Sequence, residues 1–471
     1  MKNLKIEVLD TVHCRADAYT REVIKHALSY KKEYWHRGKF AKEKRINTQH
    51  MITGRKGTGG TFLTGFLPRI KKYAKEIGFK LKVSGKLERL RPSNKPTLKG
   101  ITFREDQLKV FKKVRMNHFG RITAPTGTGK TLLELGIISM FPSSTILLLA
   151  HTKDLIKQLK EEAEKYIDID IFFPSGSEEI ESLINNKICF LQNKGCLLIT
   201  TIQSFANIDP YLYVSLFDIT IIDECHHVNK EKSQYGRVMT HNLSPRKYGF
   251  TATLPTKEDE LLFNEGIFGQ VIYDLTYDEA EESKTIAKPR IKLINVSFNP
   301  KLNQEAKNRY YSIADICIVK NKERNAAICK EAFDSISANK PTLIIIEKIE
   351  HGELIKSKML SAYGLDIPFA SGTTNQDERM ECKEDLINGK ILCVIVSRIW
   401  LEGINIRNLK TIIYTAGMKE RKKIIQAMGR GLRTYPGKDE ILLIDFLDPY
   451  RYIAEHSILR VQVYNELGWL S

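Results

Sequence analysis

The segment APTGTGKT, residues 124–131, has the composition of a loop that wraps a phosphate chain. It follows GRIT and precedes the apolar run LLELGIISM, an arrangement that predicts a strand, a loop and a helix in that order. Glycines in such a loop let backbone N–H groups approach phosphate oxygens at the start of the helix. We expect Lys130 to reach the β- and γ-phosphates of a nucleotide and the Thr131 hydroxyl to bind Mg²⁺. The predicted phosphate-binding residues are Ala124, Pro125, Thr126, Gly127, Thr128, Gly129, Lys130 and Thr131.

Two adjacent carboxylates end a second apolar run, IIDECHH at residues 221–227. Asp223 would hold Mg²⁺ together with Thr131, and Glu224 would take a proton from an attacking water. Acidic pairs are common at strand ends, so the pair gains its meaning from the phosphate-binding loop about 90 residues earlier. His226 and His227 have no cysteine or carboxylate partners at metal-ligand spacing, which favours contacts within the protein over a metal site.

A side-chain amide lies upstream of the loop, in FREDQLKVF at residues 103–111. Gln107 can pair with the donor and acceptor edges of adenine, and Arg104 could stack or bond beside it. A glutamine on a helix is more often an ordinary surface residue, so this interpretation depends on the other motifs.

Two arginines three positions apart stand in IIQAMGRGLR, residues 424–433. Glycine beside Arg430 leaves the backbone open to close approach, and the arginine fork suits phosphate oxygens. No segment within a hundred residues could hold a nucleotide, so any phosphate bound here belongs to a distant part of the chain. The alternative is a helix end with two solvated arginines.

The elements that must position these residues lie in a chain of 471 residues, which suggests roughly two to four domains. The first 100 residues hold 25 Lys and Arg against 8 Asp and Glu, a balance of +17, while the whole chain carries +18. Such a block favours a polyanionic partner, and nucleic acid is the commonest. The start of the chain lacks the long apolar run of a signal peptide, and no apolar stretch approaches the roughly 18 residues of a membrane span. The eight cysteines form no CxxC pair, which favours a reducing compartment.

The basic block is predicted to be a small α/β unit. Strands are expected at 4–10 and 80–83, and helices at 19–30 and 66–78. Between the helices, Tyr34, Trp35 and Phe40 alternate with charges, which fits either base stacking or a hairpin with core aromatics. The glycine-rich segment 54–61 lacks a lysine at the phosphate-binding place and is expected to be a loop, with Arg55 and Lys56 as candidate nucleic-acid contacts.

Two series of apolar runs follow the proline-containing segment 89–100, which is interpreted as a linker. Near-continuous apolar strands that alternate with helices indicate buried parallel sheets, and the charged stretch 277–290 between the series indicates two α/β domains. The predicted strands lie at 145–150, 196–201 and 219–223 in the first series and at 342–347, 391–396, 411–416 and 441–446 in the second.

With these motifs the chain resembles the superfamily 2 helicases and translocases over residues 101–433. LLAHTKDLIKQ is similar to motif Ia, ITTIQSF to the next nucleic-acid motif, DECH to motif II, TAT to motif III, SRIWLEGINI to motif V and QAMGRGLR to motif VI. The resemblance implies two tandem RecA-like parallel-sheet domains after the basic α/β domain, with boundaries at 1–98, 99–285 and 286–471.

The resemblance also implies roles for residues outside the phosphate-binding loop. Arg430 and Arg433 would act as arginine fingers on the γ-phosphate, with Gln426 beside them and Gly403 of motif V near the nucleotide. The nucleic-acid contacts that it implies in the motifs are His151, Thr152, Thr200, Thr201, Gln203 and Ser397, and Trp35, Arg55 and Lys56 are added from the basic block. The expected cofactors are ATP and Mg²⁺.

Within the superfamily the chain is similar to the phage UvsW-type branch-migration helicases. The grounds are the helix-forming GFLPRIKKYAKEIGFK near the start and the tail AEHSILRVQVYNELGW. This resemblance implies action on forked, four-way or single-stranded DNA, with RNA in hybrids as a further partner. It also implies a monomer that is not bound to membranes, located in the cytoplasm, or in the host cytoplasm if a phage encodes it.

Three positions depart from the family pattern. Cys225 stands where many relatives have alanine, Ser397 where threonine is usual, and Asn405 where aspartate is usual. Two other functions stay open: an RNA or R-loop helicase, and a nucleic-acid-binding protein with a vestigial ATPase. A restriction-type motor subunit is disfavoured, because no segment is large enough for a nuclease domain.

Overall fold

The computed structural model describes residues 3–37, 42–87, 90–186, 195–297, 310–372, 374–397, 406–417, 428–429, 431–432 and 434–470. The chain forms two compact units. One comprises Met1–Ala124 and Gly129–Asp274, and the other comprises Pro125–Thr128 and Leu275–Ser471. None of the described helices is long and apolar enough to cross a membrane.

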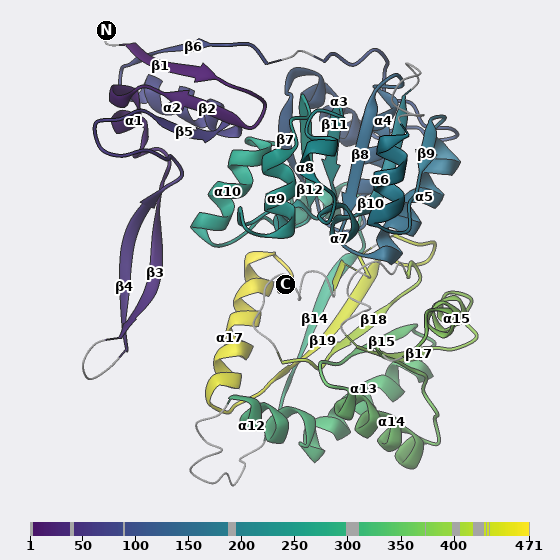
Figure 1. Ribbon diagram of the computed structural model, residues 1–471. Helices are drawn as coiled ribbons and strands as arrows, with labels where there is room; N and C mark the ends of the chain where they lie inside the picture. The colour runs from purple at the N-terminus through teal and green to yellow at the C-terminus, as the bar shows by residue number, and fades with distance from the viewer. Residues whose placement is uncertain are drawn as a thin grey trace. The chain divides into compact units, whose positions relative to one another are not determined.

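The chain begins with a small α/β domain, called here the N-terminal domain (Figure 1). Its sheet has the strand order β5-β2-β1-β6, in which β1 pairs antiparallel with β2 and parallel with β6. Apolar side chains alternate along β1, as expected for a sheet with one buried face. The elements are β1 (Asn3–Val8), β2 (His13–Ala16), α1 (Ala18–Ile24), β5 (Gly60–Leu63), the 3-10 turn η1 (Thr64–Phe66), α2 (Leu67–Glu76) and β6 (Lys80–Ser84).

A two-stranded antiparallel hairpin of β3 (Ser29–Arg37) and β4 (Lys42–His50) extends away from this sheet (Figure 1). The prediction of one helix over 19–30 is wrong at its end, because α1 stops at Ile24 and the chain enters β3 at Ser29. Ile24 and Leu28 both reach the core, so their helical spacing is real, but the pairing of Ser29 with His50 starts a strand there. The expected loop at 54–61 is correct up to Gly59, after which β5 begins.

The first large sheet has seven strands in the order β13-β7-β12-β11-β8-β10-β9, and all neighbouring strands are parallel. It is called here the first sheet domain. Its strands are β7 (Phe119–Thr123), β8 (Thr145–Ala150), β9 (Asp170–Phe172), β10 (Cys196–Thr201), β11 (Ile219–Ile222), β12 (Arg246–Thr251) and β13 (Val271–Asp274). Its helices are α3 (Glu105–Met116), α4 (Lys130–Ser139), α5 (Lys153–Tyr166), α6 (Ser177–Asn185), α7 (Ile202–Phe205), α8 (Pro210–Tyr213), η2 (Cys225–His227), α9 (Gln234–His241) and α10 (Glu258–Phe268).

Both faces of this sheet are buried. Leu148 joins a core with residues of α3, α4 and α5, whereas its neighbours Leu147 and Leu149 join a second core with residues of α6, α7, α9 and α10. Alternation of side chains along a strand explains why adjacent leucines enter different cores. The doubly covered parallel sheet accounts for the near-continuous apolar runs in the sequence.

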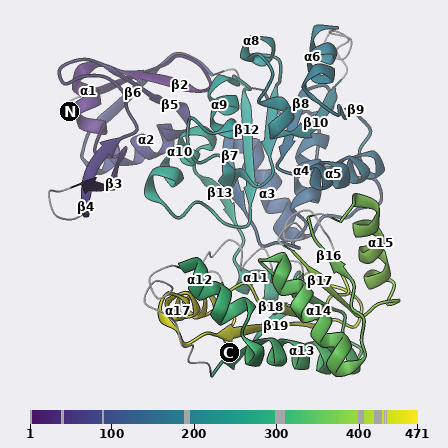
Figure 2. The same ribbon diagram turned by 60° about the horizontal axis from the view of Figure 1, so that its bottom comes forward.

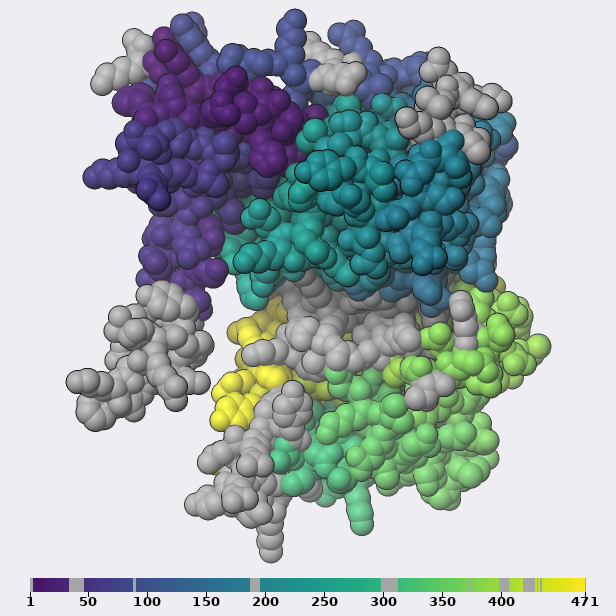
Figure 3. Space-filling model, viewed as in Figure 1, coloured from purple at the N-terminus to yellow at the C-terminus, as the bar shows by residue number. Residues whose placement is uncertain are grey.

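The N-terminal domain packs on α10 of the first sheet domain (Figure 3). Gly65 lies against the end of α10, where an added Cβ would come within 2.4 Å of the Gly266 carbonyl oxygen.

The predicted linker, 89–100, has no helix or strand among its described residues, but hydrogen bonds fix it to the first sheet domain. Ser93 N–H donates to the Met140 carbonyl at 3.1 Å, and Lys99 N–H donates to the Tyr166 carbonyl at 2.9 Å. The linker is therefore a strap along the domain surface.

The second unit contains a six-stranded parallel sheet in the order β14-β19-β18-β15-β17-β16 (Figure 2). It is called here the second sheet domain. Its strands are β14 (Lys288–Asn295), β15 (Thr342–Ile345), β16 (Phe369–Ala370), β17 (Cys393–Val396), β18 (Thr411–Tyr414) and β19 (Glu440–Leu447). Its helices are α11 (Tyr277–Glu282), α12 (Tyr310–Ala314), the π-helical turn η4 (Asp315–Val319), α13 (Lys322–Ser337), α14 (Ile349–Tyr363), α15 (Gln376–Ile387) and α17 (Arg451–Glu466).

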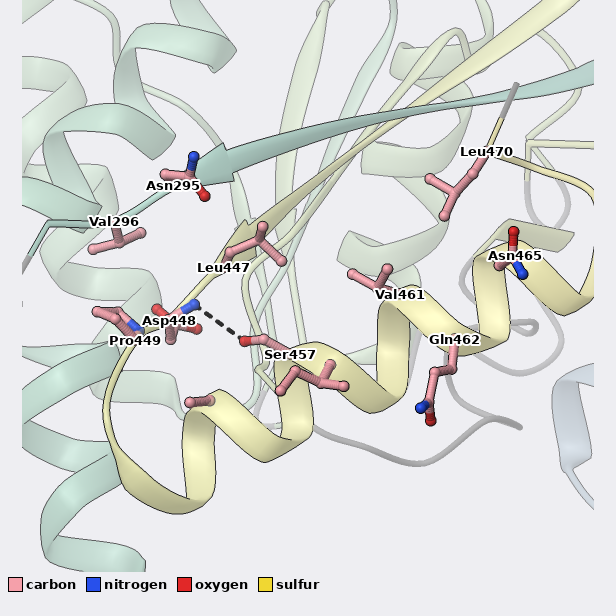
Figure 4. A pocket seen from close by; sticks show the side chains of 12 residues that line it. Asn295, Val296, Leu447, Asp448, Pro449, Ser457, Val461, Gln462, Asn465 and Leu470 are labelled. Atoms are coloured by element: carbon pink, nitrogen blue, oxygen red, sulfur yellow. Dashed lines mark hydrogen bonds between the residues drawn. The ribbon is translucent and has the colours of Figure 1, made fainter.

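The terminal helix α17 covers one face of this second sheet. Ile444 and Phe446 of β19 pack in a core with α13 and α14, so Asp445 points to the opposite face, where its carboxylate accepts from Arg460 Nε at 2.7 Å and from the Tyr464 hydroxyl at 2.8 Å. Beside α17 lies a largely apolar pocket of about 660 Å³ between the ends of β14 and β19 and the helix (Figure 4). Trp469, near the end of the chain, is buried.

Candidate nucleotide-binding and catalytic site

The phosphate-binding loop connects β7 to α4, in the strand, loop and helix order that the sequence predicts. Gly127 and Gly129 have φ of 93° and 92°, a region that L-residues with side chains rarely adopt. Thr128 Oγ1 donates to the Pro125 carbonyl at 2.8 Å. Lys130 Nζ donates to the Ala124 carbonyl at 3.2 Å, which places the ammonium group across the loop. A phosphate chain in the loop would therefore meet this cation at the amino end of α4.

Sheet order brings the second motif beside the loop. In the order β7-β12-β11, the carboxyl ends of three neighbouring parallel strands lie at one edge of the sheet. These ends lead into the phosphate-binding loop, to Thr251 and to Asp223 with Glu224. Ligands of open α/β sheets bind at this edge, because loops and helix starts converge there.

The two carboxylates of motif II have different environments. Burial raises the pKa of Asp223 to about 7, and the neighbouring Glu224 carboxylate adds to the rise, while Lys130 opposes it. Burial also acts to raise the pKa of Glu224, but the hydrogen bond from His226 and the charge of Lys130 outweigh it, and the net pKa falls to about 2. Glu224 is therefore held as a carboxylate, the form that can accept a proton.

Glu224 is positioned by two side chains. His226 Nδ1 lies 3.1 Å from Glu224 Oε2, and the Thr251 hydroxyl lies 3.2 Å from the same oxygen. His226 Nδ1 and Thr251 Oγ1 are themselves 2.9 Å apart, so the three groups form a closed set. Thr251 belongs to the TAT segment, and the set thus joins motifs II and III. His226 contacts the protein, as expected, and no group of three or more His, Cys, Asp or Glu suited to a metal occurs in the described part of the chain.

The backbone at Glu224 is strained. Its φ of 53° and ψ of 50° are left-handed, a conformation that costs a residue with a Cβ roughly 1–3 kcal/mol. Strain of this size persists only where the surrounding structure enforces it. Cys225, which follows directly, is buried and packs against Gly249, where an added Cβ would come within 2.7 Å of the Cys225 Cβ.

Gln107 lies against the phosphate-binding loop. It is buried on α3, its amide oxygen accepts from the Arg104 backbone N–H at 3.1 Å, and a Cβ on Gly129 would stand 3.1 Å from its Nε2. Nε2 has no hydrogen-bond partner in the described structure. The Arg104 guanidinium instead pairs with Asp106, at 3.0 Å from Nε and 2.9 Å from Nη2.

The candidate nucleic-acid residues of the first sheet domain have different exposures. Thr152 caps α5 and Thr201 caps α7, so both hydroxyls accept from backbone N–H groups. Thr200 is 1% exposed within β10, and its side chain does not reach the surface. Gln203 is exposed, and its amide donates to the His151 carbonyl at 3.0 Å.

A ring stack connects His151 with motif II. The His151 and His227 rings are stacked with centroids 4.4 Å apart and an interplanar angle of 12°. His227 in turn lies 4.2 Å from the His226 ring, centroid to centroid. Contacts thus run from motif Ia through His227 and His226 to Glu224.

The remaining predicted residues lie elsewhere or outside the described structure. Arg55 and Lys56 are exposed on the turn before β5, and Ser397 follows β17, where its N–H donates to the Ala370 carbonyl at 3.1 Å. Trp35 belongs to β3, but its side chain is not among those described. The following also lie outside the described residues: Gly403, Asn405, Gln426, Arg430 and Arg433.

Sequence reasoning missed one carboxyl group behind the loop. Glu134 on α4 is fully buried, and both of its carboxyl oxygens lack a hydrogen-bond partner in the described structure. Burial, reinforced by the charge of Asp223, raises the pKa of Glu134 well above its ordinary value, while the charge of Lys130 opposes the rise. The only signal in the sequence was a lone glutamate inside the apolar run LLELGIISM.

Comparison with known proteins supports this arrangement. Residues 100–256 match the family described as "Type III restriction enzyme, res subunit", and residues 323–435 match the "Helicase conserved C-terminal domain". The chain is 27% identical to the DNA 3'-5' translocase XPB2 of Sulfurisphaera tokodaii, over 74% of this chain and 82% of the relative. It is 21% identical to the ATP-dependent DNA helicase uvsW of Enterobacteria phage T4, over 73% of this chain and 71% of the relative.

A solved structure shares the fold. A Type ISP restriction-modification enzyme, LlaBIII bound to DNA, aligns with a TM-score of 0.61 at 14% identity and covers 78% of this chain. The alignment covers 30% of that longer chain. The shared part supports the two parallel-sheet domains found here.

Proposed function

We propose that this chain drives branch migration of forked and four-way DNA. The chain belongs to superfamily 2 of the ATP-hydrolysing DNA helicases and translocases, and it resembles the phage UvsW-type helicases. The observation that carries the proposal is the arrangement at the carboxyl edge of the seven-stranded sheet. There Lys130, Asp223 and Glu224 lie on neighbouring loops, with Glu224 held as a carboxylate by His226.

Each of these groups has a part in hydrolysis. Lys130 binds the β- and γ-phosphates, and the Glu224 carboxylate accepts a proton from the attacking water. Gln107 directs its Nε2 to the adenine ring. Gln426, Arg430 and Arg433 of motif VI, with Gly403 of motif V, complete the site by analogy with the family.

Thr131 and Asp223 would hold Mg²⁺, which neutralises charge on the β- and γ-phosphates when bound. The donor set fits this ion, because Mg²⁺ commonly takes one or two protein oxygens and fills its other positions with phosphate oxygens and water. The buried Asp223 at the end of β11 supplies the carboxylate, and Lys130 counters its charge until the ion is bound.

DNA would be gripped by the basic N-terminal domain together with the motif residues His151, Gln203 and Ser397. The first 100 residues carry a balance of +17, and neutralised phosphates release counterions. The domain is fixed on α10 by contacts of η1, β3 and β5, so a DNA arm bound by it would be held rigidly on the first sheet domain. This favours a substrate with more than one arm.

The test is ATP turnover with no nucleic acid, with single-stranded DNA, with four-way junction DNA and with RNA of matched length, alongside dissociation of the junction. The proposal requires the strongest stimulation by DNA and junction dissociation that needs ATP. Lys130→Ala is the matched control for both readouts.

Each other outcome points to a different function. Stimulation by RNA alone would identify an RNA helicase, and DNA stimulation without junction dissociation would identify a translocase that does not migrate branches. Absence of turnover with every nucleic acid would identify a binding protein.

A further inference from the structure

A second pocket, of about 490 Å³, lies at the amino-terminal edge of the seven-stranded sheet. It is formed where the strap crosses the end of α3 and the start of β12. Its lining residues are Arg91, Pro92, Arg115, Met116, His118 and Arg246. Parallel sheets of this kind bind nucleotides at the opposite, carboxyl edge, so the pocket is separate from the ATP site.

The lining is cationic. Three of its six residues are arginines, and none is acidic. Arg246 is 1% exposed, and no carboxylate pairs with it in the described part of the structure. Other buried arginines differ, because Arg324 pairs with Asp448 at 2.8 Å and Arg460 pairs with Asp445 at 2.7 Å. A buried charge without a counter-charge is costly, which makes Arg246 a place for an anion to bind.

Arg246 is held rigidly. Its Nε donates to the Leu90 carbonyl at 2.8 Å, and its Nη1 donates to the Val114 carbonyl at 2.8 Å and the Asn117 carbonyl at 3.2 Å. Its guanidinium carbon lies 5.0 Å from the centre of the Phe141 ring. The described contacts use Nε and Nη1 and leave the two N–H groups of Nη2 for a ligand. Side chains fixed in this way lose little entropy when an anion binds.

The pocket and the ATP site lie at opposite ends of one strand. Arg246 begins β12 and Thr251 ends it beside Glu224, so the two ends are roughly 17 Å apart at the usual rise of a strand. A ligand in the pocket therefore cannot be the nucleotide that Lys130 binds.

We propose that this pocket binds a phosphate group through Arg91, Arg115 and Arg246. Guanidinium groups bind phosphate oxygens through paired N–H donors, and a volume of this size suits a small polar ligand. The lining contains no phenylalanine, tyrosine or tryptophan on which a base could stack, so recognition is directed to the phosphate. The phosphate comes either from the backbone of a nucleic acid or from a free polyphosphate, and the experiment separates these sources.

The test compares two charge-reversed proteins. R91E/R115E reverses two pocket arginines, and K109E/K112E reverses two exposed lysines on α3 that do not line the pocket. Both carry the same change in net charge. Arg91→Glu alone is a third protein, because Arg91 makes no hydrogen bond or ion pair in the described structure, so the substitution breaks no described polar contact of the strap. Thermal melting and ATP turnover without DNA check that all three proteins are folded.

Binding of inorganic pyrophosphate is measured by calorimetry with ADP filling the ATP site, and binding of four-way junction DNA is measured over a salt series. The expected result is a loss of about tenfold in affinity for at least one ligand with R91E/R115E, and a smaller loss of the same sign with R91E, beyond the loss with K109E/K112E. A loss confined to pyrophosphate identifies a free phosphate compound. A loss confined to DNA, with a salt slope reduced by about one or two, identifies a backbone phosphate.

Equal losses in R91E/R115E and K109E/K112E for both ligands would overturn the proposal, since general charge would then explain them. The pyrophosphate measurement uses no nucleic acid, so its result stands whether or not the chain migrates DNA branches.

Discussion

Arg69 and Glu265 form a two-pronged ion pair, with 2.7 Å from Nε to Oε1 and 2.7 Å from Nη2 to Oε2. Arg69 lies on α2 of the N-terminal domain and Glu265 on α10 of the first sheet domain. Arg121 of β7 lies 3.4 Å from the same carboxylate, so one acidic group joins the two domains and pairs with a buried arginine. Paired N–H donors fix orientation as well as distance, which makes this contact a rigid one.

We expect Arg69→Ala to loosen the N-terminal domain and lower stability by about 1 kcal/mol, since Arg69 is partly exposed. Glu265→Gln should cost about 3 kcal/mol, because Arg121 would then be buried without a counter-charge. Urea unfolding and limited proteolysis of the strap measure both effects. Lys72→Ala, on the same helix with a long exposed pair to Glu76, is the control. Equal stability of the Arg69 and Lys72 variants would contradict a rigid joint.

Lys247 should make stability depend on pH. It is 1% exposed in β12, and burial lowers its pKa to about 7, with the charge of Asp10 opposing the fall. Between pH 7 and about 10.4, the unfolded chain holds a proton that the folded chain has released, so the free energy of unfolding rises with pH. Below pH 7 both states are protonated and the dependence ends.

Lys247→Met removes this dependence and should also stabilise the protein at pH 7, where a buried charge is half formed. Urea midpoints at pH 7, 8 and 9 measure the slope against Lys95→Met, an exposed lysine on the strap. If the two variants keep parallel pH profiles, the buried amine is not the group that titrates.

Glu224→Gln and Lys130→Ala should each reduce ATP turnover by at least about a hundredfold, since one loses the proton acceptor and the other the phosphate cation. Only Glu224→Gln should retain ATP binding, because the phosphate-binding loop is intact in it. Turnover and equilibrium binding of a fluorescent ATP analogue separate the two defects. Normal turnover by Glu224→Gln would mean that another group takes the proton.

His227→Ala should weaken the coupling between DNA and ATP hydrolysis. The ring stack of His151 and His227 is broken in this variant, while Lys130, Asp223 and Glu224 stay in place. We expect basal turnover to be kept and stimulation by DNA to fall at least about fivefold, the size of a modest coupling energy. His241→Ala, an exposed histidine on α9, is the control. Full stimulation of ATP turnover by DNA in His227→Ala would show that the ring stack does not couple DNA binding to ATP hydrolysis.

The sequence predicted best where the signal is local. The strands expected at 145–150 and 196–201 have those bounds in the structure, because their runs are apolar throughout and both faces are covered. The strand, loop and helix order around residues 124–131 was also correctly predicted, since it needs only a few consecutive residues. The closeness of this loop to Asp223 and Glu224 could not be read from the sequence, because it depends on the order β7-β12-β11.

Features that depend on distant partners were missed. β12 begins with Arg246 and Lys247, two charged residues that made a central strand hard to recognise in the sequence. Their hydrogen bonds to the Leu90 and Thr11 carbonyls, which lie far along the chain, could not be foreseen. Glu265 showed no sign of its partner Arg69, which is 196 positions away. A helical pattern alone could not reveal that the chain turns into a hairpin at Ser29.

The left-handed backbone of Glu224 sets thermal stability against ATP hydrolysis at one residue. Asparagine adopts this conformation with less strain, so Glu224→Asn should melt at a higher temperature while turning over no ATP. A melting curve beside a turnover assay would show the exchange directly, and a lower melting temperature would contradict it. Selection of a variant library for thermal stability alone would then enrich proteins that do not hydrolyse ATP. Only a screen that also requires ATP turnover would retain Glu224.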